Sequence, residues 1–143
     1  MKKTPIALIL LFFFFLLPGF SMAEGNPRCQ LCGMYLNKYT HVRYTINTVD
    51  SKQISTCGVQ CGLLLQLNLG NKFDSATATT LLKHRGVPAE EAFYVYKSTV
   101  ITDMSPGFIA FYTEENAKNF VKGFGGKVLN FEQAMEVVKA GFL

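Results

Sequence analysis

Alternating hydrophobic and polar positions predict two adjacent strands in the first half of the chain. Within residues 41–49 apolar or aromatic and polar side chains alternate from position 42 to position 47, the two-residue period of a half-buried strand. A turn signal at residues 50–52 follows, and Gln53–Thr56 is then expected to return as a second strand. The residues predicted to share the buried face of the first strand are Val42, Tyr44 and Ile46.

A helix and a less regular segment follow these strands. The apolar run that begins at Cys61 predicts a buried helix, and a glycine is placed to cap its far end. Beyond it, Asp74 or Ser75 is a candidate N-cap for a short helix that extends to Leu82, although the threonines there lower helix propensity. We therefore interpret residues 73–90 as the connection between two halves.

The second half has clearer boundaries. An aromatic, β-rich segment at residues 91–100, a turn at 103–107 and an apolar segment at 108–112 predict a pair of strands. Thr113 then begins a helix with an acidic first turn. The predicted buried stripe of this helix is Ala117, Phe120, Val121 and Phe124. A strand at Lys127–Leu129 and a helix at Phe131–Ala140 are expected to complete the chain.

The order of elements predicts the fold class. Each half contains two strands and a helix, a faint structural repeat without convincing residue identity. We expect an α+β fold of two small related strand–strand–helix halves with antiparallel sheets, the first half carrying a cysteine knuckle. The predicted division is an N-terminal cysteine-bearing subdomain (24–72), a connection (73–90) and a C-terminal α+β subdomain (91–143).

The first 23 residues predict a secretory signal peptide. Two lysines precede the apolar run Ile6–Leu17, and Ser21–Ala23 has small residues at the positions that a signal peptidase reads. The run is shorter than the about 20 residues of a membrane span, although an uncleaved anchor is the alternative. We expect cleavage after Ala23 and a periplasmic protein. No acceptor cysteine ends the apolar run, so a lipoprotein is not expected.

Charge and motif content exclude several functions. The chain has 14 basic and 10 acidic residues, and the predicted signal peptide contains two of the basic ones and no acid. The net charge is therefore +4 for the whole chain and 12 − 10 = +2 without the predicted signal peptide. This charge is too small to create the positive surface potential that binds nucleic acid. No serine–histidine–acid set, paired catalytic carboxylates or phosphate-binding glycine loop stands out. We therefore expect that the protein is not an enzyme. We also expect that it binds neither nucleic acid nor a small-molecule substrate.

Four cysteines in two close pairs carry the strongest chemical signal. Cys29 and Cys32 are followed closely by Met34, and Cys57 and Cys61 form a second pair further on. Thiolate and thioether donors favour Cu(I) or Zn(II) over a hard ion. A thiolate at the start of the predicted helix would also be stabilised by the positive helix end.

Three other uses of the cysteines remain open. An exported chain meets an oxidising compartment, where the four thiols can form two disulfides. A bridge within either pair would close a very short loop and stabilise little. A structural or sensory zinc module of the treble-clef type shares the spacing of the two pairs. A thiol–disulfide protein using Cys29 and Cys32 is the third alternative, although no thioredoxin-like βαβ frame surrounds them.

The cysteine motif and the C-terminal pattern together resemble the NosL family, the exported copper-binding accessory proteins of nitrous oxide reductase. The cysteine part is Cys-x2-Cys-Gly-Met at residues 29–34 with Cys-x3-Cys at 57–61. The C-terminal part is Ala92-Phe93-Tyr94-Val95, Ser98, Met104, Ala110-Phe111, Ala117, Phe120, Gly125-Gly126-Lys127-Val128 and Phe131. The resemblance covers nearly all of the chain after the signal. It implies an α+β fold of related halves, Cu(I) binding and a chaperone function.

The resemblance also implies a site and a partner. The expected partner is nitrous oxide reductase or its maturation machinery at the inner membrane, and Zn(II) is the alternative to Cu(I). The candidate metal ligands are Cys29, Cys32, Met34, Cys57, Cys61 and Met104. His41, near the first cysteine pair, is a further candidate, and His84 in a basic turn is a weaker one.

The chain departs from the family pattern in three respects. Many members of the family are lipoproteins, whereas this chain lacks the acceptor cysteine, so a soluble or signal-anchored form is expected. Met104 stands between Asp103 and Ser105, where many members of the family have a Pro-Met-Gly run. Three of the cysteines occur in only part of the family. They therefore either form a structural metal knuckle apart from the copper site or bind copper themselves.

Overall fold

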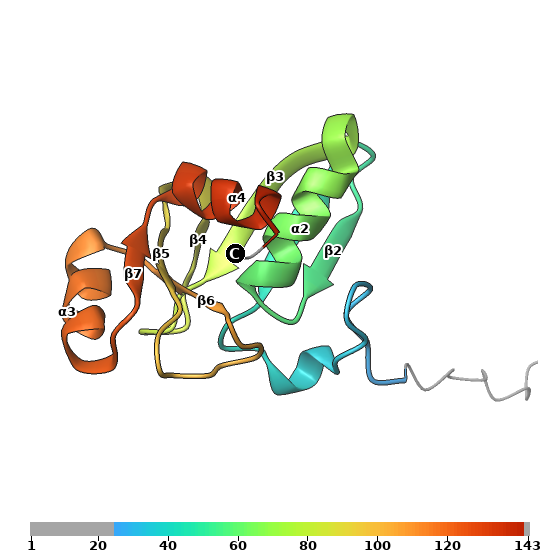
Figure 1. The fold of residues 1–143 in the computed structure, drawn as a ribbon. Coiled ribbons are helices and arrows are strands. Elements are labelled where there is room, and N and C mark those ends of the chain that lie inside the picture. The colour runs from blue at the N-terminus through green and yellow to red at the C-terminus, as the bar shows by residue number, and fades with distance from the viewer. Residues whose placement is uncertain (1–24, 142–143) are drawn as a thin grey trace, which may run out of the picture.

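The structure, a computed structural model, describes residues 25–141, so the predicted signal peptide lies outside the described residues. Within this range no helix combines the length and the apolar character that a membrane crossing needs. Figure 1 shows the arrangement of the elements. In chain order they are η2 (Leu36–Lys38), β1 (Tyr44–Thr48), β2 (Gln53–Thr56), α2 (Val59–Leu69), η3 (Gly70–Lys72), β3 (Phe73–Thr79), β4 (Gly86–Pro88), η4 (Ala89–Glu91), β5 (Phe93–Tyr96), β6 (Phe108–Phe111), α3 (Glu114–Phe124), β7 (Lys127–Leu129) and α4 (Phe131–Lys139).

The two halves share one topology. In the first sheet β1 lies between β2 and β3, and β4 extends the sheet beyond β3; in the second sheet β5 lies between β6 and β7. All of these pairings are antiparallel. The helices α2 and α3 occupy equivalent places, each between the second and third strands of its half. The predicted α+β fold of two related halves is therefore confirmed.

The short helix expected from Asp74 or Ser75 to Leu82 is wrong, because β3 occupies most of this region and β4 follows it. The central strand β1 pairs along its length with β3, and this pairing turns Ala76 and Ala78 into the core. Alternating threonines and alanines suit a pleated strand better than a helix. The segment predicted to connect the halves thus supplies two strands to the first sheet.

The second sheet is covered on both faces. Tyr94 and Phe108 pack into the main core, which also contains Tyr44 of β1 and Leu63 of α2. The opposite face of the sheet packs beneath α3 in a smaller core formed by Val95, Ile109, Phe111 and Ala117. Because both faces of β6 are covered, every residue of this strand is buried.

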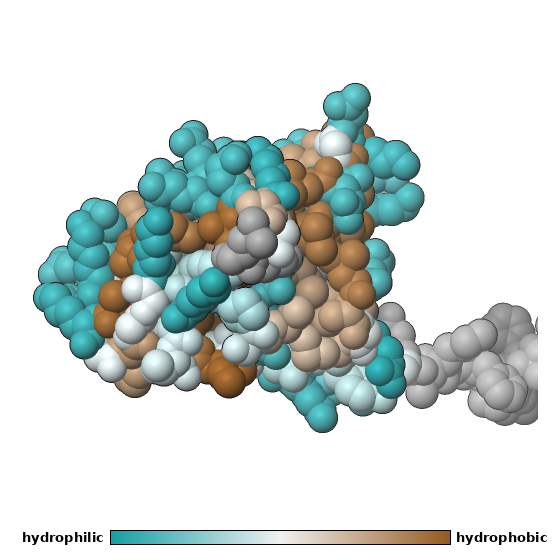
Figure 2. Space-filling model, in the orientation of Figure 1, coloured by the Kyte–Doolittle hydropathy of each residue, from teal (hydrophilic) through white to brown (hydrophobic). Residues whose placement is uncertain are grey.

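Helix α3 begins where the sequence predicts, since the Thr113 hydroxyl accepts a hydrogen bond from the amide of Asn116. Its predicted buried stripe is only partly right. Ala117 is fully buried, but Phe124 is 47% exposed and leans on the ring of Phe120. Figure 2 shows polar residues over the outer faces of α3 and α4, and apolar residues gathered along α2.

Helix α2 lies unusually close to β1. A Cβ atom at Gly62 would overlap the ring of Tyr44, which is fully buried and donates a hydrogen bond to Gln66 of the same helix. Only a glycine permits this approach, and the approach sets the position of the amino end of α2.

Gly62→Ala is expected to lower the free energy of unfolding by about 1–3 kcal/mol, because the added methyl group overpacks the core against Tyr44. Gly123→Ala in α3 is the matched control, since nothing lies within 4 Å of a Cβ atom there. This second change is expected to stabilise by about 0.5–1 kcal/mol through helix propensity. Urea unfolding of both variants measures the difference, and equal stability would contradict the close contact.

Candidate metal centre

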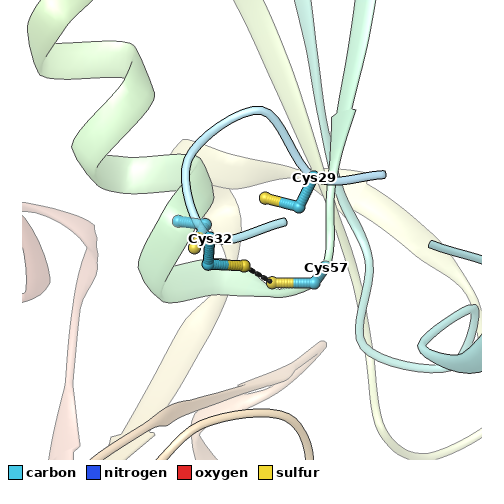
Figure 3. Close-up of side chains that lie close together, drawn as sticks. Cys29, Cys32 and Cys57 are labelled. Carbon is cyan, nitrogen blue, oxygen red and sulfur yellow. Dashed lines mark hydrogen bonds between the residues drawn. The ribbon is translucent and has the colours of Figure 1, made fainter. Parts of the chain in front are cut away.

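Four cysteine thiols converge at one end of α2. The sulfur atoms of Cys29, Cys32, Cys57 and Cys61 all lie within 4.8 Å of one another. Figure 3 shows the sulfur atoms of Cys29, Cys32 and Cys57 turned toward one another. Around one tetrahedral ion with metal–sulfur bonds of about 2.3 Å, sulfur atoms lie about 3.8 Å apart. The thiol cluster therefore has the dimensions of a site for a single ion.

The four cysteines are free thiols in this structure. Between Cys32 and Cys57 the sulfur atoms are 3.4 Å apart, well beyond the about 2.05 Å of a disulfide bond. Cys32 is exposed, whereas the other three are buried. The cluster is thus enclosed on most sides and open to solvent at one sulfur.

A tight turn presents the first pair. The Cys29 amide donates to the carbonyl of Met34 at 2.8 Å, and the Gly33 amide donates to the carbonyl of Cys29 at the same distance. Gly33 has φ +75°, a conformation that side chains disfavour. Outside the turn, the Arg28 guanidinium stacks on the ring of Tyr35 and hydrogen-bonds the Gly33 carbonyl at 3.0 Å. These contacts hold Cys29 and Cys32 on the same side of the backbone.

The second pair belongs to the amino end of α2. Cys57 precedes the helix, Gly58 is its N-cap, and Cys61 lies in its first turn. The helix begins two residues earlier than the run starting at Cys61 suggested. No acidic residue occurs in this first turn, so the positive helix end faces the thiols without a competing carboxylate from α2. The Thr56 hydroxyl donates to the Gly58 carbonyl at 2.9 Å and fixes the entry to the helix.

The loop between β5 and β6 closes over the cluster from the second half. The sulfur of Met104 lies 3.7 Å from that of Cys61, and a carboxylate oxygen of Asp103 lies 4.0 Å from the sulfur of Cys57. Met34 packs against the same cluster. The structure thus brings together all six sulfur residues that the sequence singled out.

Asp103 is the neighbour of the site that sequence reasoning missed. Its carboxylate lies against Gly58, where a Cβ atom would overlap it. An acidic residue in a turn is ordinary, and nothing in its local sequence indicates contact with thiols. The two histidines lie beside each other, with ring centroids 6.2 Å apart, and are not part of the four-thiol cluster.

The thiols differ in acidity. Burial raises the pKa of Cys29, but hydrogen bonds from the amides of Cys32, Cys57 and Leu31 outweigh it and lower that pKa to about 7. Burial raises the pKa of Cys32 to about 11. A hydrogen bond with Cys61, followed by burial, raises the pKa of Cys57. Near neutral pH the site therefore holds ionised and protonated thiols together, and an ion that binds it must displace protons.

The fold and this site define an α+β protein with a centre for one soft metal ion. The sequence pattern of the NosL family matches residues 21–138. This match covers most of the chain, which therefore belongs to the NosL family.

Two individual proteins are similar to the chain. The HTH-type transcriptional repressor CutR of Bacillus subtilis (strain 168) is 28% identical over 114 residues. That alignment covers 79% of this chain, and the chain spans only 59% of the length of CutR. The crystal structure of the copper chaperone NosL from Shewanella denitrificans matches with a TM-score of 0.65 at 19% identity, covering 82% of this chain and 96% of the other. This structural match shows that the fold is shared.

The amide hydrogen bonds to Cys29 predict a thiolate that forms near pH 7 in the metal-free, reduced protein. Because its pKa is lowered from 9.0 to about 7, this thiolate is present above that pH and lost as the pH falls through it. Ultraviolet thiolate absorbance against pH is expected to show a step there that Cys29→Ser removes.

Cys32→Ser is the matched control for this titration. It removes the other thiol of the same turn but keeps the backbone amide that donates to Cys29. The step near pH 7 is expected to survive in this variant. If Cys29→Ser leaves the step in place, the assignment of the acidic thiol is wrong.

Proposed function

We propose that this protein is an exported Cu(I)-binding chaperone that delivers copper for the maturation of nitrous oxide reductase. The observation that carries the proposal is the gathering of four thiols and two thioethers from three separate segments around one point. Membership of the NosL family and the fold shared with a protein described as a copper chaperone support it. Copper is the cargo of this function rather than a resident cofactor.

The donor set suits Cu(I) in particular. Cu(I) is soft and binds thiolate and thioether sulfur with few ligands, whereas structural Zn(II) takes four. Met104 lies against Cys61, and Met34 packs beside the cysteines, so two neutral donors supplement the thiols. A purely zinc-binding cluster would give these methionines no role beyond packing.

A surplus of ligands suits transfer. Cu(I) held by two or three of the six sulfur atoms leaves the others free to replace a ligand that departs. Cys32 is the exposed thiol, so a sulfur ligand of the partner can approach there while the buried thiols retain the ion. Each protonated thiol that binds Cu(I) releases a proton, and it regains a proton when the ion leaves.

A metal-sensing function is the second candidate. CutR, which is similar to this chain, is described as a transcriptional repressor, and four clustered thiols also complete a Zn(II) site. A sensor keeps its ion, whereas a chaperone hands it on. A thiol–disulfide function is a weaker alternative, because it would leave the two methionines without a chemical role.

Replacing Met34 and Met104 together with leucine is expected to weaken Cu(I) binding by about tenfold or more, equivalent to ~1.4 kcal/mol, while Zn(II) affinity stays nearly unchanged. Leucine keeps the volume and the apolar contacts but removes the thioether. Anaerobic titration of the reduced protein against chelators for each ion measures both affinities.

Met135→Leu is the matched control, since Met135 lies on α4 and packs against the main core, away from the cysteines. It is expected to change neither affinity. Equal Cu(I) affinity in the double variant and the control would remove the thioethers from the proposed site.

Delivery and export are tested separately. The Cu(I)-loaded protein is mixed anaerobically with copper-free nitrous oxide reductase, and copper transfer is followed after separation of the two proteins. Retention of the ion would favour the sensing function. Mass measurement of the protein recovered from the periplasm is expected to give a chain that begins at residue 24.

A further inference from the structure

Positive charge is concentrated in the segments that adjoin the metal centre. These are the first segment (residues 28–43), which presents the first cysteine pair, the turn after β3 (80–86) and the loop between β5 and β6 (97–107). Together they contain six basic residues and one acid. The rest of the described chain contains six basic residues and eight acids. The small net charge of the protein therefore conceals a division between the site and the remainder.

Hydrogen bonds and sulfur contacts place these segments beside one another. The Thr79 amide, at the end of β3, donates to the Arg43 carbonyl at 2.8 Å, so the turn begins next to the first segment. The loop reaches the cysteines through Met104, whose sulfur lies 3.7 Å from that of Cys61. In Figure 1, η2, the turn and the loop lie along the lower edge of the molecule. The positive charge is thus gathered on the side where the metal centre opens.

The one acid of these segments faces the metal centre. The carboxylate of Asp103 accepts a hydrogen bond from the Thr102 hydroxyl at 2.9 Å and lies against Gly58, beside the thiols. Its charge is therefore directed at the thiols, and the surface around the opening is left positive. Within the described residues the ion pairs join acids and lysines of other segments, and none involves Arg28, Lys38, Lys83 or Arg85.

Two of the cations stand next to the exposed thiol of Cys32. The Arg28 guanidinium lies 3.9 Å from the centroid of the Tyr35 ring and donates to the carbonyl of Gly33, the residue after Cys32. The Lys38 ammonium lies 5.7 Å from the centroid of the same ring. An exposed tyrosine thus holds two positive charges beside the point at which the site meets solvent.

Exposed apolar side chains occur in the same three segments. Leu31 stands between the two cysteines of the first turn, and Ile101, 68% exposed, belongs to the loop that carries Met104. Apolar residues rimmed by charged ones are typical of a surface that meets a partner. Of the seven large hydrophobic residues exposed in the described chain, these segments contain four, namely Leu31, Tyr35, Leu82 and Ile101.

We propose that these residues form a docking surface for an acidic protein that exchanges Cu(I) with this chain, one whose own soft-metal site is surrounded by carboxylates. The proposal rests on the proposed chaperone function and adds the chemistry by which the partner is recognised. Opposite charges speed the encounter and orient the two proteins, and the apolar residues then make the contact around Cys32. The docking surface consists of Arg28, Leu31, Tyr35, Lys38, Leu82, Lys83, Arg85 and Ile101.

A membrane of anionic lipids is another surface that attracts positive charge. An amphipathic helix is the usual element that binds such a membrane, whereas turns, a loop and the three-residue η2 form the docking surface. A membrane would also cover Cys32, the thiol at which a partner can exchange the ion. The observations therefore favour a protein.

The test uses two synthetic Cu(I) acceptor peptides that differ only in charge. Both contain one Cys-x-x-Cys motif and a fluorophore that Cu(I) quenches, with glutamates around the motif in one and lysines in the other. Each is mixed anaerobically with the untagged, Cu(I)-loaded protein, and the initial rate of quenching is recorded. At about 0.01 M salt, where the Debye length is about 30 Å, we expect transfer to the acidic peptide to be about tenfold faster or more. At about 1 M salt the two rates are expected to converge.

Lys38→Glu locates the charge that matters, and Lys72→Glu is its matched control. Each lysine is exposed and is the last residue of a short 3-10 helix, η2 or η3, so the two variants have the same net charge. At low salt Lys38→Glu is expected to slow transfer to the acidic peptide about threefold or more, whereas Lys72→Glu leaves the rate nearly unchanged. Lys83→Glu is expected to act like Lys38→Glu. Cu(I) affinity measured against a chelator is expected to stay nearly unchanged in all three, which shows that they are folded.

The outcomes separate the docking surface from the chaperone function. Equal rates for the two peptides at low salt, or equal losses in Lys38→Glu and Lys72→Glu, would overturn the docking surface and leave the chaperone function in place. Transfer to neither peptide would contradict the chaperone function and the docking surface with it. The protein is not expected to sediment with vesicles of phosphatidylglycerol and phosphatidylcholine. Sedimentation that Lys38→Glu abolishes would reassign the surface to a membrane.

Discussion

The close contact between α2 and β1 is the constraint on which the site depends. Gly62 lies directly against the ring of Tyr44, and a larger residue would push the helix away from the sheet. Cys57 and Cys61 stand at the amino end of this helix, five residues and one residue before Gly62. A displacement of the helix would therefore move two of the four thiols at once. Packing in the core thus controls the geometry of the site at the surface.

The repeated topology explains how residues distant in sequence reach the same point. Each half begins with a hairpin, but the first hairpin has a short turn and the second has the loop at residues 97–107. This longer loop carries Asp103 and Met104 to the amino end of α2, where they meet the cysteines of the first half. The site is consequently formed by both halves. The longer loop of the second half thus supplies two residues of the site that the short turn of the first half has no counterpart for.

Local signals in the sequence predicted most of the elements and the four cysteines of the sulfur cluster, whereas Met104 was implied by the family resemblance. The alternation in β1 and the cap at Thr113 depend on neighbouring residues only, and the cysteine spacing is itself a local pattern. Strand β3 was missed because Asp74 resembles a helix cap, whereas its pairing with β1 is decided across the sheet. The positions of Asp103 and His84 depend on loops that converge from separate strands. No local pattern encodes such convergence.

Accessibility and acidity are divided between the two cysteines of the first turn. Cys32 meets solvent, but its pKa is raised to about 11, so it keeps its proton at neutral pH. Cys29 ionises near pH 7 but is only 2% exposed. Peroxides and alkylating agents react with thiolates that they can reach, and neither sulfur offers both properties. Within this turn the sulfur that ionises most readily is therefore the one that such reagents reach least.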